Sequence, residues 1–131
     1  MSIPSPNRPS AGPHFQVIHL DTARERAHPT GSHEDRYTVV LPLQADGSFD
    51  QAGWEASPEL CTVARTIHGV TTHGRLQRND DSEWVFEFDD NADSTEVVFR
   101  FAYERFAPGE YIGMRRADGE HVLRVVSLQP V

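Results

Sequence analysis

The sequence predicts an all-β protein, a small antiparallel barrel or sandwich of seven to eight strands with one short helix. Two stretches carry this prediction. Residues 83–88 alternate strictly, with Trp84, Phe86 and Phe88 on one side, which is the pattern of a half-buried strand. Residues 106–128 contain two apolar-rich runs around Asp118-Gly119, a dipeptide that favours the tight turn of a β-hairpin.

The composition of the first thirteen residues predicts a disordered tail. They include four prolines and three serines and too few apolar side chains to offset the entropy cost of ordering. We therefore expect a single β domain over residues 14–131, a length that can bury a core without disulfides or a structural metal.

Two strands are expected early in the domain. Residues 14–20 place Ile18 and Leu20 on one face, and a polar, exposed loop over residues 21–36 is expected to follow. Residues 37–43 are rich in β-branched side chains, but Pro42 lacks an amide donor. This second strand should therefore lie at a sheet edge or end near Pro42.

A short helix is expected next. Ser48 and Gln51 have the spacing of a capping box, in which each side chain satisfies a free amide at the helix start. Gly53 weakens the helix and Pro58 ends it. Trp54 is the expected anchor of this helix in the core.

Strands are expected through the rest of the chain. Cys61, Val63 and Ile67 share one face of a strand that Arg65 interrupts, and a polar strand over residues 74–78 points Leu76 inward. Residues 79–82 and 89–95 have the composition of loops.

Residues 96–103 alternate again, and we expect one face of this strand to carry Val97, Phe99, Phe101 and Tyr103.

The final hairpin has an expected register. With Asp118-Gly119 as the turn, Ala117 pairs with Glu120, and the apolar face is built from Met114 opposite Leu123 and Ile112 opposite Val125.

Composition excludes several classes of function. The net charge of −8 is spread along the chain and disfavours nucleic acid and anionic membranes as partners, because phosphates require a clustered basic surface. Cys61 is the single cysteine, so nothing indicates an oxidising compartment. With no long apolar run and no signal segment in the sequence, a cytoplasmic location is expected.

Histidines are the candidate metal ligands. His68 and His73 flank residues 69–72 and would face each other across a hairpin, close enough to share a metal ion. His28 and His33 offer a second cluster. Known motifs such as HExxH and CxxC are absent, so loop histidines without a metal are the alternative reading.

Residues 74–128 resemble the opening strands of the flavin-binding barrel in the ferredoxin reductase superfamily. The run APGEYIGM is similar to the family's "PGQY" strand through Pro108, Gly109 and Tyr111. The run RVVS is similar to its Arg-x-Tyr-Ser strand through Arg124 and Ser127.

The resemblance implies a cofactor, FMN or FAD, and a set of binding residues. Arg124 would contact the flavin phosphate and Ser127 would bond the flavin, with Tyr111 in the first motif, while Val126 stands in place of the tyrosine that stacks on the flavin ring. Independently of the resemblance, Gly113 would let a ligand approach the backbone beside Arg124.

No catalytic constellation stands out, because the sequence has no GxSxG elbow and no glycine-rich phosphate loop. The sequence therefore favours a small, soluble, non-catalytic binding or interaction module that recognises a protein partner or a small apolar ligand, and that could form a homodimer. The alternatives left open are a degenerate, reductase-like flavin barrel and a histidine-based metal-binding protein.

Overall fold

The structure is a computed structural model of the 131-residue chain, and it describes residues 14–22, 32–67, 69–89, 95–98, 105–116 and 119–131. The tail predicted over residues 1–13 lies outside these ranges. Within them, no helix is long and apolar enough to cross a membrane.

The described chain is built mainly of strands, so the predicted all-β class is confirmed. Its elements are β1 (His14–Thr22), β2 (Ser32–Leu43), α1 (Gln51–Ala56), the 3-10 turn η1 (Pro58–Leu60), β3 (Thr62–Ile67), β4 (Val70–Arg78), β5 (Trp84–Phe88), β6 (Thr95–Val98), β7 (Tyr111–Arg116) and β8 (Gly119–Pro130).

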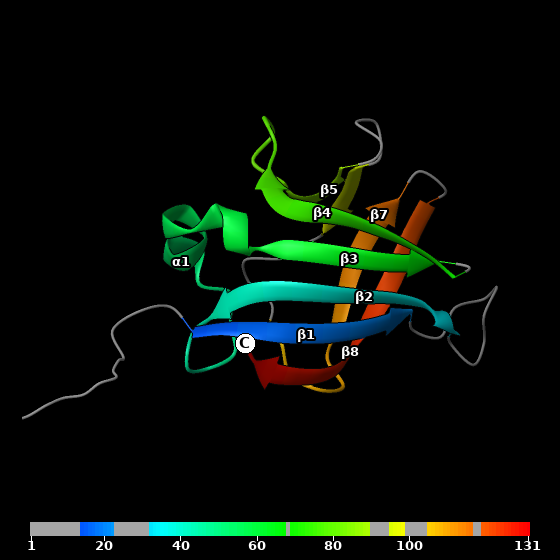
Figure 1. The fold of residues 1–131 in the computed structure, drawn as a ribbon, viewed down its shortest axis with the longest axis horizontal. Helices are drawn as coiled ribbons and strands as arrows, with labels where there is room; N and C mark the ends of the chain where they lie inside the picture. Colours follow the sequence, from blue (N-terminus) through cyan, green and yellow to red (C-terminus); the bar gives the residue numbers. More distant parts are fainter. Residues whose placement is uncertain (1–13, 23–31, 68, 90–94, 99–104, 117–118) are drawn as a thin grey trace, which may run out of the picture.

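The eight strands form a closed barrel in which each strand is antiparallel to the next one along the chain. Pairing of β1 with β8 closes the barrel, with Gln16 opposite Pro130 and Thr22 opposite Leu123. In Figure 1 this closure appears as the first and last strands lying side by side. A barrel of eight strands has an interior just wide enough for side chains to fill it or for one small ligand.

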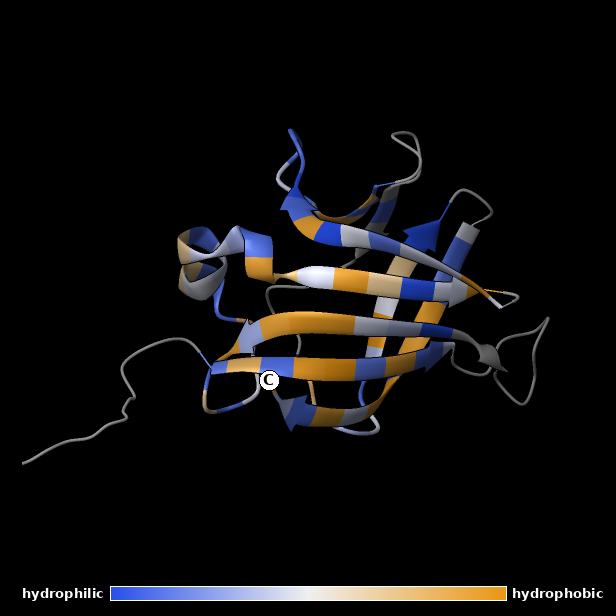
Figure 2. Ribbon diagram, viewed as in Figure 1, coloured by the Kyte–Doolittle hydropathy of each residue, from blue (hydrophilic) through white to orange (hydrophobic). Residues whose placement is uncertain are grey.

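Alternating side chains fill this interior. Ile18 and Leu20 on β1, Val39 and Leu41 on β2, and their counterparts on the other strands are at most 5% exposed. Figure 2 shows the consequence along β1 to β4, where apolar and polar residues share each strand. The strand period of two residues sends one set inward and leaves the other in water.

α1 covers one end of the barrel, where it lies beside the ends of β2 and β3 (Figure 1). The Trp54 ring meets the Trp84 ring edge to face at 4.9 Å, and its Nε1 donates to the Leu76 carbonyl oxygen at 3.1 Å. Phe49 makes the same edge contact with Trp84, also at 4.9 Å. The predicted role of Trp54 as the anchor of a short helix is confirmed.

The predicted capping box is wrong. Asp50 is the N-cap, and its carboxylate accepts from the Gly53 amide at 3.2 Å. Ser48 instead donates its amide and its hydroxyl to Asp46 within the preceding turn. Asp46 competes successfully for Ser48 because a carboxylate two residues away forms a local turn that needs no helix.

The predicted loop over residues 21–36 is wrong at both ends, because β1 runs to Thr22 and β2 begins at Ser32. Pro42 lies in β2 beyond the β2–β3 ladder, which spans Arg36 to Val39. The strand therefore ends its pairing with β3 before the residue that lacks a donor, as the sequence indicates.

The β7–β8 register differs from the predicted one by two residues. Arg116 pairs with Gly119, so Ile112 lies opposite Leu123 and Met114 opposite His121. The turn residues 117–118 lie outside the described residues. The shift keeps every side chain on its predicted face, since the period of a strand is two.

The inward face of β6 differs from the predicted apolar face by one residue. Glu96, not Val97, stands opposite the inward-facing Phe86, and Val97 is paired with Val85 and Arg115. Residues 99–104 of the predicted strand lie outside the part of the chain that the structure describes. This phase is explained by Tyr37 and Arg65, which hold Glu96 inside the barrel.

Candidate functional site

A cluster of polar side chains lies inside the barrel, at the end opposite α1. The Tyr37 hydroxyl on β2 donates to Glu96 Oε1 on β6 at 2.7 Å, and Arg65 Nη1 on β3 donates to Glu96 Oε2 at 2.5 Å. Tyr37 and Glu96 are 0% and 2% exposed. Because β2 and β6 are not neighbours in the barrel, these bonds cross its interior.

Arg65 interrupts the apolar face of β3, as the sequence indicates, and its contacts explain why a charged side chain is tolerated there. Its guanidinium carbon lies 4.1 Å from the centre of the Phe88 ring, so the cation rests on an aromatic face while it binds Glu96. Its side chain is 18% exposed, so it reaches water at the barrel end. A buried carboxylate is tolerated here because each oxygen has a donor.

Arg116 brings a second guanidinium to the cluster. Its Nη1 lies 3.4 Å from the Tyr37 hydroxyl. Burial and the neighbouring Glu96 charge raise the pKa of Tyr37 far above its ordinary value, against the opposing effect of Arg116. Tyr37 therefore stays protonated and acts as a hydrogen-bond donor, not as a base.

A narrow cavity in the described interior has a volume of about 10 Å³ and lies among Ile18, Leu20, Val39, Leu41, Phe86, Phe106, Ile112 and Leu123. That volume is about what one water molecule needs, and the lining residues are apolar. This cavity therefore has no room for a small ligand.

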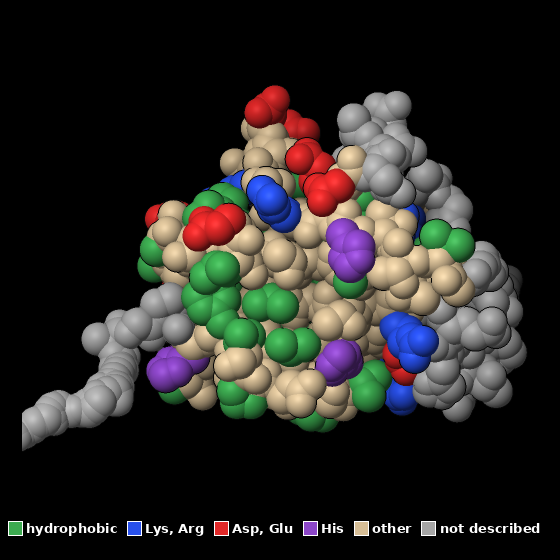
Figure 3. Space-filling view, viewed as in Figure 1, with side chains coloured by type: hydrophobic (Ala, Val, Ile, Leu, Met, Phe, Trp, Pro, Cys, Tyr) green, Lys and Arg blue, Asp and Glu red, His purple; other side chains and the backbone are tan. Residues whose placement is uncertain are grey.

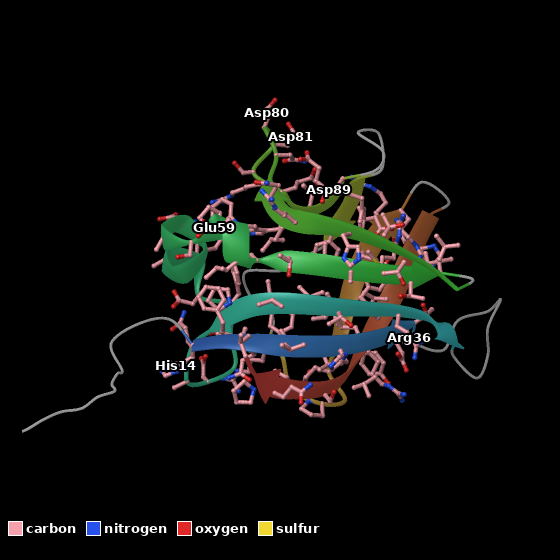
Figure 4. The ribbon with its side chains drawn as sticks, viewed as in Figure 1. His14, Arg36, Glu59, Asp80, Asp81 and Asp89 are labelled. Atoms are coloured by element: carbon pink, nitrogen blue, oxygen red, sulfur yellow. The ribbon has the colours of Figure 1, made fainter. Side chains whose placement is uncertain are left out.

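A shallow groove of about 380 Å³ lies at the other end of the barrel. Figure 4 labels His14 there, at the far end of the sheet from Arg36. The groove is lined by His14, Gln16, Leu43, Gln44, Ala45 and Gly47. His14 is its one titratable side chain, so this lining lacks a paired acid and base or a nucleophile.

The outer surface of the last hairpin gathers exposed apolar side chains. The interior residues Ile112, Met114 and Leu123 are at most 2% exposed, so the alternate residues point outward. We call these outward residues the β7–β8 face: Tyr111, Gly113 and Arg115 on β7, and Glu120, Val122 and Arg124 on β8.

Three of the four residues that the resemblance and the hairpin indicated as cofactor contacts lie on this face. Tyr111 is opposite Arg124, and Gly113 is opposite Val122. Tyr111 is 57% exposed. Ser127 lies apart, opposite His19 on β1, where a register shift around Val126 separates it from Arg124. Flavin binding stays a prediction.

The histidine pair is not arranged as predicted. Ile67 pairs with Val70, which leaves a loop of two residues, and His73 lies opposite Ala64. His68 and His28 lie outside the described residues. Across the ranges that are described, no group of three or more His, Cys, Asp or Glu side chains could hold a metal ion. Metal binding by His68 and His73 stays a prediction.

Cys61 is a buried, unreactive thiol. It is 0% exposed, and burial, with a smaller effect of Glu59, raises the pKa of Cys61 to about 12. It behaves as the small hydrophobe that the sequence indicates.

Outside β7 and β8, the exposed large hydrophobic residues of the described chain are Leu60, Val70 and Val131. Acidic side chains of the β4–β5 loop, Asp80 and Asp81, lie on the same side of the molecule as Asp89 and Glu59 (Figure 4). Figure 3 shows hydrophobic side chains over β1 to β3 between histidines. In this area Val17 and Val40 are half-buried, unlike Tyr111.

Together these features define a closed, antiparallel eight-stranded barrel with a filled interior and an outer apolar face. Comparison with models of known families, with curated proteins and with solved structures finds no match.

Sequence reasoning missed Glu96, the centre of the buried cluster. One signal could have found it. Arg65 interrupts an otherwise apolar strand face, and a cation on such a face requires a buried carboxylate elsewhere in the chain.

Proposed function

We propose that this chain is a non-catalytic interaction module that recognises a protein through its β7–β8 face. The observation that carries the proposal is the position of the solvent-exposed apolar side chains. Six large hydrophobic residues of the described chain are exposed. Among them, Tyr111 and Val122 lie on the β7–β8 face at 57% and 39%, and Val126 follows farther along β8 at 44%. Neighbouring exposed apolar residues mark contact surfaces, whereas single ones do not.

The interior supports the same proposal. The cavity lined by the inward side chains of β1, β2, β5, β7 and β8 measures about 10 Å³, which leaves no room for a small molecule in it. Ligand sites usually measure about 300 to 1,000 Å³. Recognition is therefore expected on the outside of the barrel.

The chemistry of the face suits a protein partner. Tyr111 and Arg124 are cross-strand neighbours, and aromatic and arginine side chains are enriched where proteins bind each other. Arg115 and Glu120 form the opposite end of the face. They provide charges of both signs around the apolar Val122.

Site-specific photo-crosslinking tests the proposal. A photoreactive amino acid replaces Tyr111 in the full chain, and the cells that produce it are irradiated. The matched control carries the same residue at Val70, which is 66% exposed on β4. We expect a discrete protein adduct from position 111 and none from position 70. No adduct from position 111, or equal adducts from both, would contradict the proposal.

A further inference from the structure

The β7–β8 face is complementary to itself. Three outward cross-strand pairs follow one another along the hairpin: Arg115 with Glu120, Gly113 with Val122, and Tyr111 with Arg124. In each pair, the β7 residue is complementary in charge or shape to its β8 neighbour. A cation lies beside an anion, a residue without a side chain beside a valine, and an aromatic ring beside a guanidinium.

We propose that the protein bound at the β7–β8 face is a second copy of this chain, packed face to face about a twofold axis parallel to the strands. This inference rests on the proposed function. Such an axis places β8 of one copy over β7 of the other. Each outward pair within the chain is then repeated between the two copies.

Charge complementarity follows from that arrangement. Glu120 of each copy meets Arg115 of the other, so two ion pairs form about the axis. The Arg115 side chain is 49% exposed and lies 3.8 Å from Glu83. Arg124 of each copy meets the ring of Tyr111 of the other, and a cation is attracted to an aromatic face.

Shape favours this axis over a twofold axis perpendicular to the strands. With the parallel axis, each Val122 lies over the Gly113 of the other copy, where no side chain fills the space. The perpendicular axis would stack Val122 on Val122 and leave the two glycines facing each other. Packed sheets interdigitate their side chains, as only the first arrangement permits.

Sedimentation velocity on the full chain tests the dimer over a hundredfold range of protein concentration that reaches about 1 mM. We expect a monomer–dimer equilibrium, and we expect Val122→Asp to weaken it at least tenfold. The control Val70→Asp places the same charge at an exposed valine on β4 and should leave the equilibrium unchanged. Far-UV circular dichroism of each variant checks that the barrel is folded.

Charge exchange tests the arrangement. Glu120→Arg and Arg115→Glu should each weaken the homodimer, because like charges then meet across the axis. An equimolar mixture of these two variants should form a heterodimer of at least the original affinity. Glu120→Arg mixed with Arg124→Glu should not, since that recovery would require the perpendicular axis. If Glu120→Arg regained affinity when mixed with Arg124→Glu but not when mixed with Arg115→Glu, the proposed arrangement would be overturned.

The outcomes separate this inference from the proposed function. If the wild type stays monomeric while position 111 crosslinks to a different protein, the second copy is wrong and the interaction module remains. If the wild type dimerises but Val122→Asp and Val70→Asp act alike, the dimer uses another surface and the inference fails.

Discussion

Arg65 shows what a single residue can reveal before the fold is known. It interrupts the apolar face of β3, and it is held there by Glu96 at 2.5 Å and by the ring of Phe88. A guanidinium inside a barrel needs a compensating charge, because burying an isolated ion costs several kcal/mol or more. A charge on an apolar strand face is therefore a reason to look for a partner of opposite charge.

At the residue scale, Trp84 should be costly to truncate. It is 5% exposed and contacts both Phe49 and Trp54 edge to face. We expect Trp84→Ala to lower the free energy of unfolding by about 3 to 5 kcal/mol. Urea denaturation measures this loss. Leu60→Ala, at a residue 49% exposed, is the control and should cost far less.

Tyr37 predicts a decline in stability at alkaline pH. Its pKa is raised in the folded protein by burial and by Glu96, whereas an unfolded tyrosine ionises near about pH 10. Its contribution is therefore fully present below about pH 10 and is lost as the pH rises toward the folded pKa.

Urea denaturation at about pH 9, 10 and 11 measures this effect in the wild type and in Tyr37→Phe. The variant should be less stable at pH 9, because Glu96 loses a donor, but its free energy of unfolding should fall less steeply above pH 10. Equal slopes for the two proteins would show that Tyr37 titrates alike in both states.

At the scale of elements, the β7–β8 hairpin separates what local sequence determines from what it leaves open. The faces of Ile112, Met114, Leu123 and Val125 are as predicted, because a strand alternates whatever its register. The register itself differs by two residues. The side of a strand follows from its pattern, but its pairing partner depends on the turn and on the neighbouring strands.

Gly74 on β4 is required by the approach of β5. A Cβ atom at this position would lie 2.2 Å from the Glu87 carbonyl oxygen and 2.8 Å from the Phe88 Cα. Both are backbone atoms, so the two strands would have to separate. We expect Gly74→Ala to lower the free energy of unfolding by about 1 to 3 kcal/mol, measured by urea denaturation.

Val70→Ala is the matched control for Gly74→Ala, because it lies on the same strand but its side chain is 66% exposed. It should change stability by less than about 0.5 kcal/mol. If Gly74→Ala were as mild as this control, the close approach of β4 and β5 would be wrong.

At the scale of the whole molecule, closure of the barrel brings the two ends of the described chain together. Gln16 pairs with Pro130, and the Val131 amide donates to the Phe15 carbonyl oxygen at 3.2 Å. Closing a sheet into a barrel removes the edges at which another chain could add a strand. Contacts with other proteins are then left to its faces and ends.

Closure predicts that a circular permutant folds. A short linker joins Val131 to His14, and the chain opens between Asp80 and Asp81, in the exposed β4–β5 loop. We expect the far-UV circular dichroism of the wild type and cooperative thermal unfolding. A second permutant, opened inside β4 between Gly74 and Arg75, should fail to fold. Failure of the loop permutant would contradict the pairing of β1 with β8.

Local patterns were enough to predict the class of fold and the inward faces of most strands, because these follow from a period of two residues in neighbouring side chains. The short helix anchored by Trp54 was predicted from local signals at its ends, of which Pro58 was right and the capping box was wrong. The phase of β6 and the hairpin register depended on contacts between distant strands. The tertiary structure also brought Tyr37, Arg65 and Glu96 together across the barrel. Glu96 faces inward because its partners lie 59 and 31 residues away, and no local pattern encodes contacts over that distance.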